Sequence, residues 1–89
     1  MAVSEAQIER AIALSKAYGV SRLILFGSAA ESPETAQDLD LACDGIAGWR
    51  IFELGAQIED ELGTSVDLIP LRPSTPFTRI VERKGKVLI

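Results

Sequence analysis

Residues 22–43 read RLILFGSAAESPETAQDLDLAC, and this stretch decides the fold. Its first five residues, Arg22 to Phe26, form a short apolar run that ends at Gly27, which is typical of a buried strand followed by a turn. The residues from Asp38 to Cys43 alternate polar with apolar or small side chains, which is the periodicity of a strand. The small and polar stretch from Ala29 to Gln37 predicts a short helical turn and a loop between the two strands.

Predicted helices and strands alternate outward from this stretch. We expect helices at about 4–18, at about 48–62 and from Thr75-Pro76 to Gly85, because apolar residues recur at helical spacing and a glycine follows each run. We expect two more strands, at 66–71 and 86–89. Such alternation predicts an α/β (α+β) fold in which helices pack on a sheet.

The composition is that of one small folded domain. The chain has 89 residues, 47% hydrophobic and 25% charged, which leads us to expect a single domain over residues 1–89. A domain of this size is only marginally stable alone, so a partner or homo-oligomer formation would help it.

Charge and residue usage exclude several classes of function. The net charge is −4 without a basic cluster, so we expect no autonomous binding of nucleic acid. The chain has no histidine, which removes histidine-dependent triads and histidine–zinc sites. It has one cysteine, Cys43, which we expect in the core, and no apolar run long enough for a membrane span or a signal peptide. These features favour a cytoplasmic protein.

Three carboxylates stand in predicted strands, where aspartate is disfavoured. Asp38 and Asp40 are two residues apart, so in a strand both side chains lie on one face, roughly 6.6 Å apart along the backbone. Asp67 lies inside the apolar run VDLIPL. If the two strands are neighbours, the three acids converge. Three close carboxylates repel one another, so we expect one raised pKa unless a cation such as Mg²⁺ neutralises them.

Gly27 and Ser28 follow the first strand and form a candidate phosphate site. Glycine lets a phosphate approach the backbone closely, and the helix start that follows offers free N–H groups. An alternative interpretation makes Ser28 a helix N-cap with Glu31 as its capping-box partner, and we give the two equal weight. For the three acids, the alternative is a set of solvated surface carboxylates, and we favour the metal site.

These motifs together resemble the minimal nucleotidyltransferases of the DNA polymerase beta superfamily. The matching residues are LFGS at 25–28, DLDL at 38–41 and VDLI at 66–69, and the terminal PFTRIVERKGKVLI is similar to the last helix and strand of that family. The resemblance covers nearly the whole chain and implies the nucleotidyltransferase fold, with a small mixed sheet and helices packed on it.

The resemblance also implies a function. Gly27 and Ser28 would bind the triphosphate of ATP or another NTP, Asp38 and Asp40 would hold Mg²⁺, and Asp67 would complete the catalytic and metal-binding triad. Small members of the family act as antitoxins that pair with an all-helical HEPN toxin and adenylylate it. The expected reaction is transfer of a nucleoside monophosphate, AMP, from NTP to a hydroxyl of such a partner.

One departure from the family leaves a second function open. Members usually carry a basic residue soon after Gly-Ser, whereas this chain has Ala29 and Ala30 there, followed by Glu31. Either Mg²⁺ and distant arginines, with Arg72 and Arg79 as candidates, compensate, or nucleotide binding is weak. The alternative function is therefore a weak or inactive nucleotidyltransferase-fold antitoxin that neutralises its partner by binding alone. A plain Mg²⁺ or Ca²⁺ binding domain ranks last.

Overall fold

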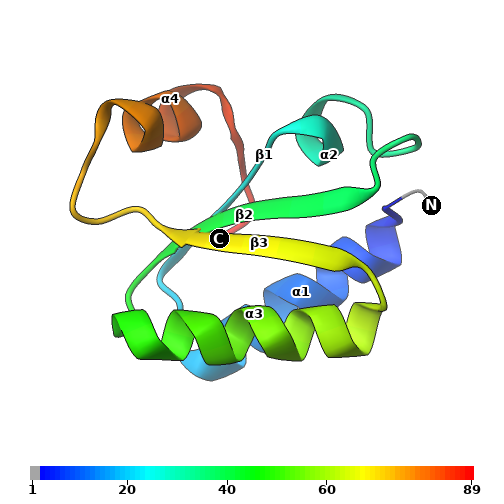
Figure 1. The fold of residues 1–89 in the computed structure, drawn as a ribbon, viewed down its shortest axis with the longest axis horizontal. Coiled ribbons are helices and arrows are strands. Elements are labelled where there is room, and N and C mark those ends of the chain that lie inside the picture. The colour runs from blue at the N-terminus through cyan, green and yellow to red at the C-terminus, as the bar shows by residue number, and fades with distance from the viewer. Residues whose placement is uncertain (1–2) are drawn as a thin grey trace.

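Eight elements follow one another along the chain in the computed structural model, which describes residues 3–89 (Figure 1). Their order is the one that the sequence predicts. The elements are α1 (Glu5–Tyr18), β1 (Arg22–Phe26), α2 (Ser28–Glu31), β2 (Asp38–Asp44), α3 (Gly48–Leu62), β3 (Ser65–Pro70), α4 (Pro76–Lys84) and β4 (Lys86–Val87).

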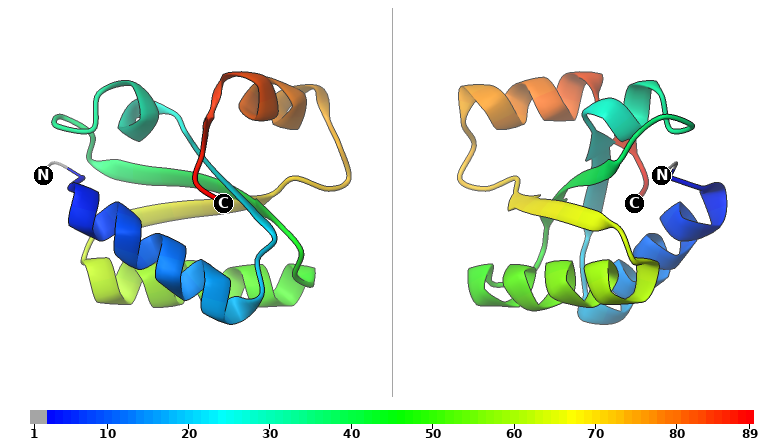
Figure 2. Two further views of the ribbon diagram at one scale, coloured as in Figure 1. Left: turned by 180° about the vertical axis from the view of Figure 1, so that it is seen from behind. Right: turned by 45° about the vertical axis from the view of Figure 1, so that its right-hand side comes forward.

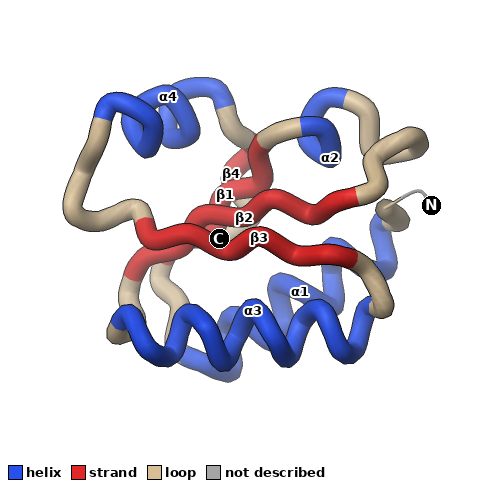
Figure 3. The backbone as a smooth tube through the Cα atoms, viewed as in Figure 1, coloured by secondary structure: helices blue, strands red, loops and turns tan. Residues whose placement is uncertain are grey.

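The four strands form one mixed sheet in the order β3-β2-β1-β4. The strand β1 pairs antiparallel with both β2 and β4, and β2 pairs parallel with β3. Figure 3 shows the strands as the middle layer of the molecule. Helices α1 and α3 cover one face of this layer, and α2 and α4 lie on the other, as Figures 1 and 2 show from three directions. The predicted α/β (α+β) fold is therefore confirmed.

The larger hydrophobic core lies between the sheet and helices α1 and α3. Alternate residues of the two central strands point into it, and all of them are fully buried: Leu23, Leu25, Leu39 and Leu41. The opposite face carries a smaller core under α4, built on Ile24, Ala42, Leu71 and Val81. Because the small core covers only part of its face, the same face has room for polar side chains elsewhere along β2 and β3.

The ends of the helices are set by the residues that the sequence marks. Ser4 caps α1 in a capping box with Gln7, and Thr75 caps α4 with Pro76 at the first helical position. Gly19 and Gly63 end α1 and α3 in the left-handed conformation, with φ values of 93° and 65°. The predicted helix bounds are thus confirmed to within a residue.

Three details differ from the prediction. β3 begins at Ser65 and ends at Pro70, which stands at the end of an edge strand as expected for a residue without an N–H. β4 is only Lys86–Val87, although Leu88 still donates its N–H to the Leu23 carbonyl. In α4, helical spacing predicts Phe77, Ile80 and Val81 on the buried side, but Phe77 is 53% exposed and only Val81 joins the small core. Among residues 3–89, no helix combines the length and apolar character that crossing a bilayer requires.

Candidate active site

The strand register brings two of the three predicted acids directly opposite each other. Asp40 in β2 is the register partner of Asp67 in β3, and Asp38 is the partner of Ser65. Partners in adjacent parallel strands point to the same side of the sheet, as do residues two apart in one strand. Asp38, Asp40 and Asp67 therefore share one face, and this part of the sequence prediction agrees with the geometry.

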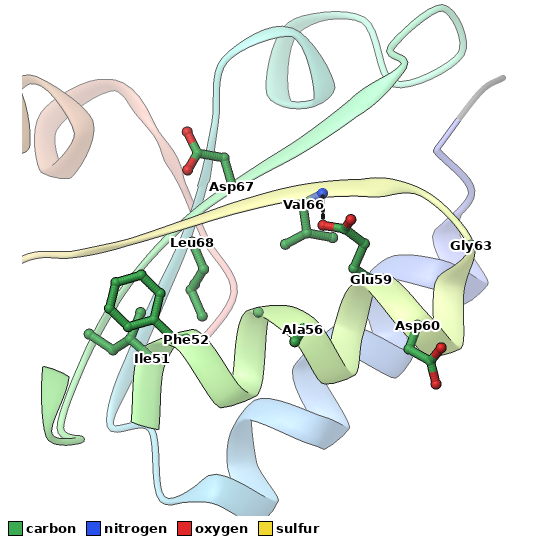
Figure 4. Close-up of a pocket in the computed structure, with 10 residues that line it drawn as sticks. Ile51, Phe52, Ala56, Glu59, Asp60, Gly63, Val66, Asp67 and Leu68 are labelled. Atoms are coloured by element: carbon green, nitrogen blue, oxygen red, sulfur yellow. Dashed lines mark hydrogen bonds between the residues drawn. The ribbon is translucent and has the colours of Figure 1, made fainter. Parts of the chain in front are cut away.

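The acids stand on the face that carries α2 and α4. Figure 4 shows Asp67 pointing away from α3, while its neighbour Leu68 points toward that helix. Asp38 and Asp67 are exposed and Asp40 is half-buried. Leu39 and Leu41, which flank Asp40, are fully buried on the opposite face. The alternation of β2 thus holds the carboxylates toward solvent by anchoring the leucines between them.

Within residues 3–89, none of the ion pairs involves Asp38, Asp40 or Asp67. Burial, then the charge of Asp67, then the charge of Asp38 raise the pKa of the Asp40 carboxyl above its ordinary value of 3.8. A raised pKa within the trio is what the sequence predicts for carboxylates without a cation. A divalent ion would offset the repulsion and favour the ionised form of Asp40.

The residues present fit a magnesium ion that is shared with a substrate. Within residues 3–89, no three acidic or cysteine side chains come close enough to enclose a metal by themselves. Mg²⁺ usually takes only one or two carboxylates and completes its coordination with water and substrate phosphates. A pair formed by Asp40 and Asp67, with Asp38 beside it, offers that number of hard oxygen ligands.

Gly27 borders the acids and occupies a backbone conformation that suits glycine alone. Its φ and ψ are 71° and −153°, and a Cβ at this position would overlap Oδ2 of Asp40. The backbone at the end of β1 therefore comes as close to the carboxylate as glycine permits. The role of Gly27 beside a phosphate stays a prediction.

Ser28 is the first residue of α2, and the N-cap is Gly27. The capping-box interpretation of Ser28 with Glu31 is therefore wrong, because the chain already turns at Gly27 and leaves the Ser28 hydroxyl without a capping hydrogen bond. The N–H groups of Ser28 and Ala29 belong to the first turn of the helix, which has no intrahelical acceptor for them. Those groups and the hydroxyl remain available to a ligand.

The basic side chains near the site differ from those that the sequence prediction names. Arg72 pairs with Glu82 at 3.3 Å, and Arg22 pairs with the same carboxylate at 2.6 Å. The charge of Arg72 is thus already partnered by Glu82, and the same pairing lowers the pKa of Glu82. Lys84, which the prediction omits, lines a cavity of about 270 Å³ together with Gly27.

That cavity lies between α2 and α4. Its apolar part is lined by Phe26, Phe77 and Ile80. The rings of Phe26 and Phe77 pack edge to face, with 5.7 Å between their centroids. Lys84 follows Ile80 by four residues, so one face of α4 presents both. The spacing is visible in the sequence, but only the docking of α4 brings that face next to Gly27.

Other side chains singled out in the sequence have structural roles. Cys43 is buried in the core as predicted, and burial raises its pKa to about 11, so it is not a reactive thiolate. Glu59 and Glu61 are exposed on α3, and each also makes a contact with another element. Glu59 accepts a hydrogen bond from the Val66 N–H at 3.2 Å, and Glu61 pairs with Arg10 at 2.8 Å.

Comparison by sequence finds no matching protein family and no matching curated protein. Solved structures do match. One, described as a candidate minimal nucleotidyltransferase, has a TM-score of 0.74 and 29% identity, covering 90% of this chain and 87% of its own.

Two further matches are toxin–antitoxin complexes. A tri-AMPylated HEPN toxin of Shewanella oneidensis in complex with an MNT antitoxin matches with a TM-score of 0.73 and 22% identity over 96% of this chain and 71% of that one. A toxin–antitoxin structure with AMP-PNP matches with a TM-score of 0.76 and 24% identity over 92% and 72%. The resemblance that the motifs predict is therefore confirmed at the level of the fold.

Proposed function

Starting from a chain that has the minimal nucleotidyltransferase fold, we propose that it transfers AMP from ATP to a hydroxyl of a protein partner, in the presence of Mg²⁺. The partner in this proposal is a HEPN-type toxin, and the chain is its antitoxin. The observation that carries the proposal is the position of Asp40, which lies opposite Asp67 and against the backbone of Gly27.

The chemistry follows from this arrangement. The acceptor oxygen forms a bond to the α-phosphorus, the bond from that phosphorus to the oxygen bridging to the β-phosphorus breaks, and pyrophosphate leaves. The hydroxyl proton passes to the exposed carboxylate of Asp67 or to water. Asp38, Asp40 and Asp67 are the residues that would hold Mg²⁺, and the ion would supply charge stabilisation for the phosphoryl oxygens. Gly27 and Ser28 bind the triphosphate through backbone N–H groups and the serine hydroxyl.

Two further observations support the nucleotide and the partner. Structures with the same fold include one with AMP-PNP and one with an AMPylated HEPN toxin. Asp67 lies in β3, an edge strand, where a second protein has access to it.

A second candidate function is neutralisation of the toxin by contact alone. Ala29 and Ala30 stand where the family resemblance leads us to expect a basic residue, and Arg72 is partnered by Glu82. In this alternative the triphosphate lacks a cation beside Gly-Ser. Lys84, which borders the same cavity as Gly27, is the side chain that would replace it and favours the first function.

The test is a transfer assay. The protein is incubated with Mg²⁺, α-labelled ATP and the helical protein encoded beside it, next to an Asp38→Asn/Asp40→Asn double variant. We expect label on the partner with the wild-type protein and at least ~100-fold less with the variant, the range for loss of metal or acid–base groups. A tight complex without labelling, equal for both proteins, would instead establish neutralisation by contact.

A further inference from the structure

The free edge of β3 and the helix α3 enclose a groove of about 750 Å³, which borders the proposed site only at Asp67. Its floor is apolar and consists of Ile51, Val66 and Leu68. On the α3 side, the small residues Gly55 and Ala56 leave space in the groove. Phe52 forms one wall and is 82% exposed, a costly position for a phenylalanine without a partner. The volume lies within the range of ~300–1,000 Å³ that is usual for binding pockets.

The outer edge of β3 runs along the groove, and at one residue its backbone N–H and carbonyl are free to pair with another strand. The Val66 N–H points outward, since it donates to Glu59, and the Leu71 N–H points inward, since it donates to the Cys43 carbonyl. Strand alternation then directs the N–H and carbonyl of Leu68 outward as well. Glu59 occupies the outward N–H of Val66, and Pro70 has none, so Leu68 is the position in β3 that can pair with a further strand.

The residues around the groove are acidic, which favours a basic partner. Residues 51–67 contain five carboxylates and no basic residue. Glu59 and Asp60 lie on the rim of the groove itself (Figure 4). An acidic rim around an apolar floor complements a segment with basic and apolar side chains.

We infer that the groove and the Leu68 edge bind an extended, basic segment of the acceptor protein, which adds to the sheet as a fifth strand beside β3. In such a strand, alternate side chains point to opposite faces. The residue paired with Leu68 places an apolar side chain in the groove. Its neighbour opposite Asp67 points to the other face of the sheet, beside the acids (Figure 4).

This arrangement deepens the proposed function and rests on it for the role of the hydroxyl. A tyrosine, serine or threonine next to an apolar residue in the added strand lies beside Asp67, at the edge of the site. The groove thus selects an acceptor hydroxyl by the residues that flank it, whereas the acids carry out the transfer.

Gly55 gives a matched pair of variants for the test. A Cβ at Gly55 would lie 3.6 Å from Cβ of Leu68, an ordinary contact, so Gly55→Ala keeps the groove almost unchanged. Gly55→Leu fills the groove. Both replacements improve helix propensity inside α3, and thermal unfolding of each variant checks that the fold is retained before peptide is added.

The probe is the capped peptide Lys-Val-Tyr-Val-Lys, titrated into isotope-labelled protein and followed by amide chemical shifts and hydrogen exchange. We expect the peptide to shift groove residues and protect the Leu68 amide in wild type and in Gly55→Ala. In Gly55→Leu, and with a peptide whose valines are N-methylated, we expect binding at least ~10-fold weaker, equivalent to ~1.4 kcal/mol. Equal binding to Gly55→Leu, or no effect at Leu68 up to millimolar peptide, overturns the inference.

Peptide binding and the transfer assay test the groove and the proposed function separately. Peptide binding needs neither nucleotide nor catalysis, so it can succeed where the transfer assay fails. Conversely, if Gly55→Leu labels the acceptor protein as fast as wild type, the groove is not the acceptor site although the transfer function stands. AMP-PNP binding to Gly55→Leu is expected to remain unchanged, because Gly55 faces Leu68 from α3, whereas the Asp67 side chain points away from that helix.

Discussion

At the scale of single residues, Gly27 links the backbone to the candidate site, because its lack of a side chain leaves space for the Asp40 carboxylate. Its φ of 71° and ψ of −153° are accessible to glycine alone, and a Cβ would overlap the Asp40 carboxylate. We expect Gly27→Ala to lower the free energy of unfolding by ~1–3 kcal/mol, the usual cost of such backbone strain. Urea denaturation measures this change.

The control for Gly27 is Gly48→Ala. A Cβ at Gly48 would meet no atom within 4 Å, and this residue starts α3 with an ordinary helical backbone. We expect it to be neutral or to stabilise the protein by up to ~1 kcal/mol. Equal destabilisation by the two substitutions would contradict the account of Gly27.

Asp40 is the residue whose charge the fold tolerates least. Its pKa is raised in the folded protein, by burial first and then by Asp67 and Asp38, so folding disfavours its ionised form. The stability cost is absent below the unfolded value of 3.8, develops as pH rises through the folded pKa, and is complete above it. In EDTA, Asp40→Asn should therefore be more stable than wild type at about pH 7 and equal to it at about pH 3.

Mg²⁺ adds a second observable for Asp40. The ion should stabilise the wild-type protein at neutral pH more than it stabilises Asp40→Asn, because it removes the charge repulsion only where the charge exists. Asp60→Asn, an equal charge change at an exposed residue of α3, serves as control in the same denaturation series. A variant that is less stable than wild type at neutral pH in EDTA would show that the carboxylate does not carry this cost.

At the scale of the elements, α4 depends on its first turn. This helix has nine residues and places Phe77, Ile80 and Lys84 around the cavity beside Gly27. Thr75 accepts a hydrogen bond from the Thr78 N–H at 3.1 Å, and the Thr78 hydroxyl accepts one from the Thr75 N–H at 2.8 Å. A short helix relies on such caps, because few residues share the cost of its nucleation.

We expect Thr75→Ala to lower the free energy of unfolding by ~0.5–2 kcal/mol, the range measured for loss of an N-cap side chain. The neighbouring Ser74→Ala, at an exposed position outside the helix, should change it by less than ~0.5 kcal/mol. Chemical denaturation of both variants checks the difference. If Ser74→Ala has the larger effect, the capping box does not hold the helix start.

At the scale of the whole molecule, a small domain responds strongly to a ligand. Saturating Mg²⁺ with AMP-PNP at ~100 times its dissociation constant should add ~2.7 kcal/mol to the free energy of unfolding. For a domain of this size, each kcal/mol raises Tm by ~4–8 °C, so the expected shift is ~10–20 °C. Differential scanning fluorimetry measures the shift, and the Asp38→Asn/Asp40→Asn variant should show almost none. A wild-type Tm that does not move would exclude a nucleotide site in the isolated chain.

The sequence alone determined the elements and the residue types of the site. Patterns within a few residues, namely helix caps, glycines that end helices and the alternation of strands, were sufficient to predict the elements. They predicted the helix from Gly48 to Leu62 and the common face of Asp38 and Asp40. The ambiguity at Ser28 was also local: the sequence predicted a turn at Gly27, but only the structure showed that Gly27 is the N-cap of α2.

Only the tertiary structure decided which distant residues meet. The parallel register that sets Asp67 opposite Asp40 depends on how two strands far apart in sequence align, and the pairing of Arg72 with Glu82 depends on where α4 docks. Lys84 beside Gly27 and the open edge at Leu68 arise in the same way. Periodicity specifies which face a residue occupies, whereas the packing of whole elements specifies its neighbours, because contacts between elements are fixed only when all of them share one core.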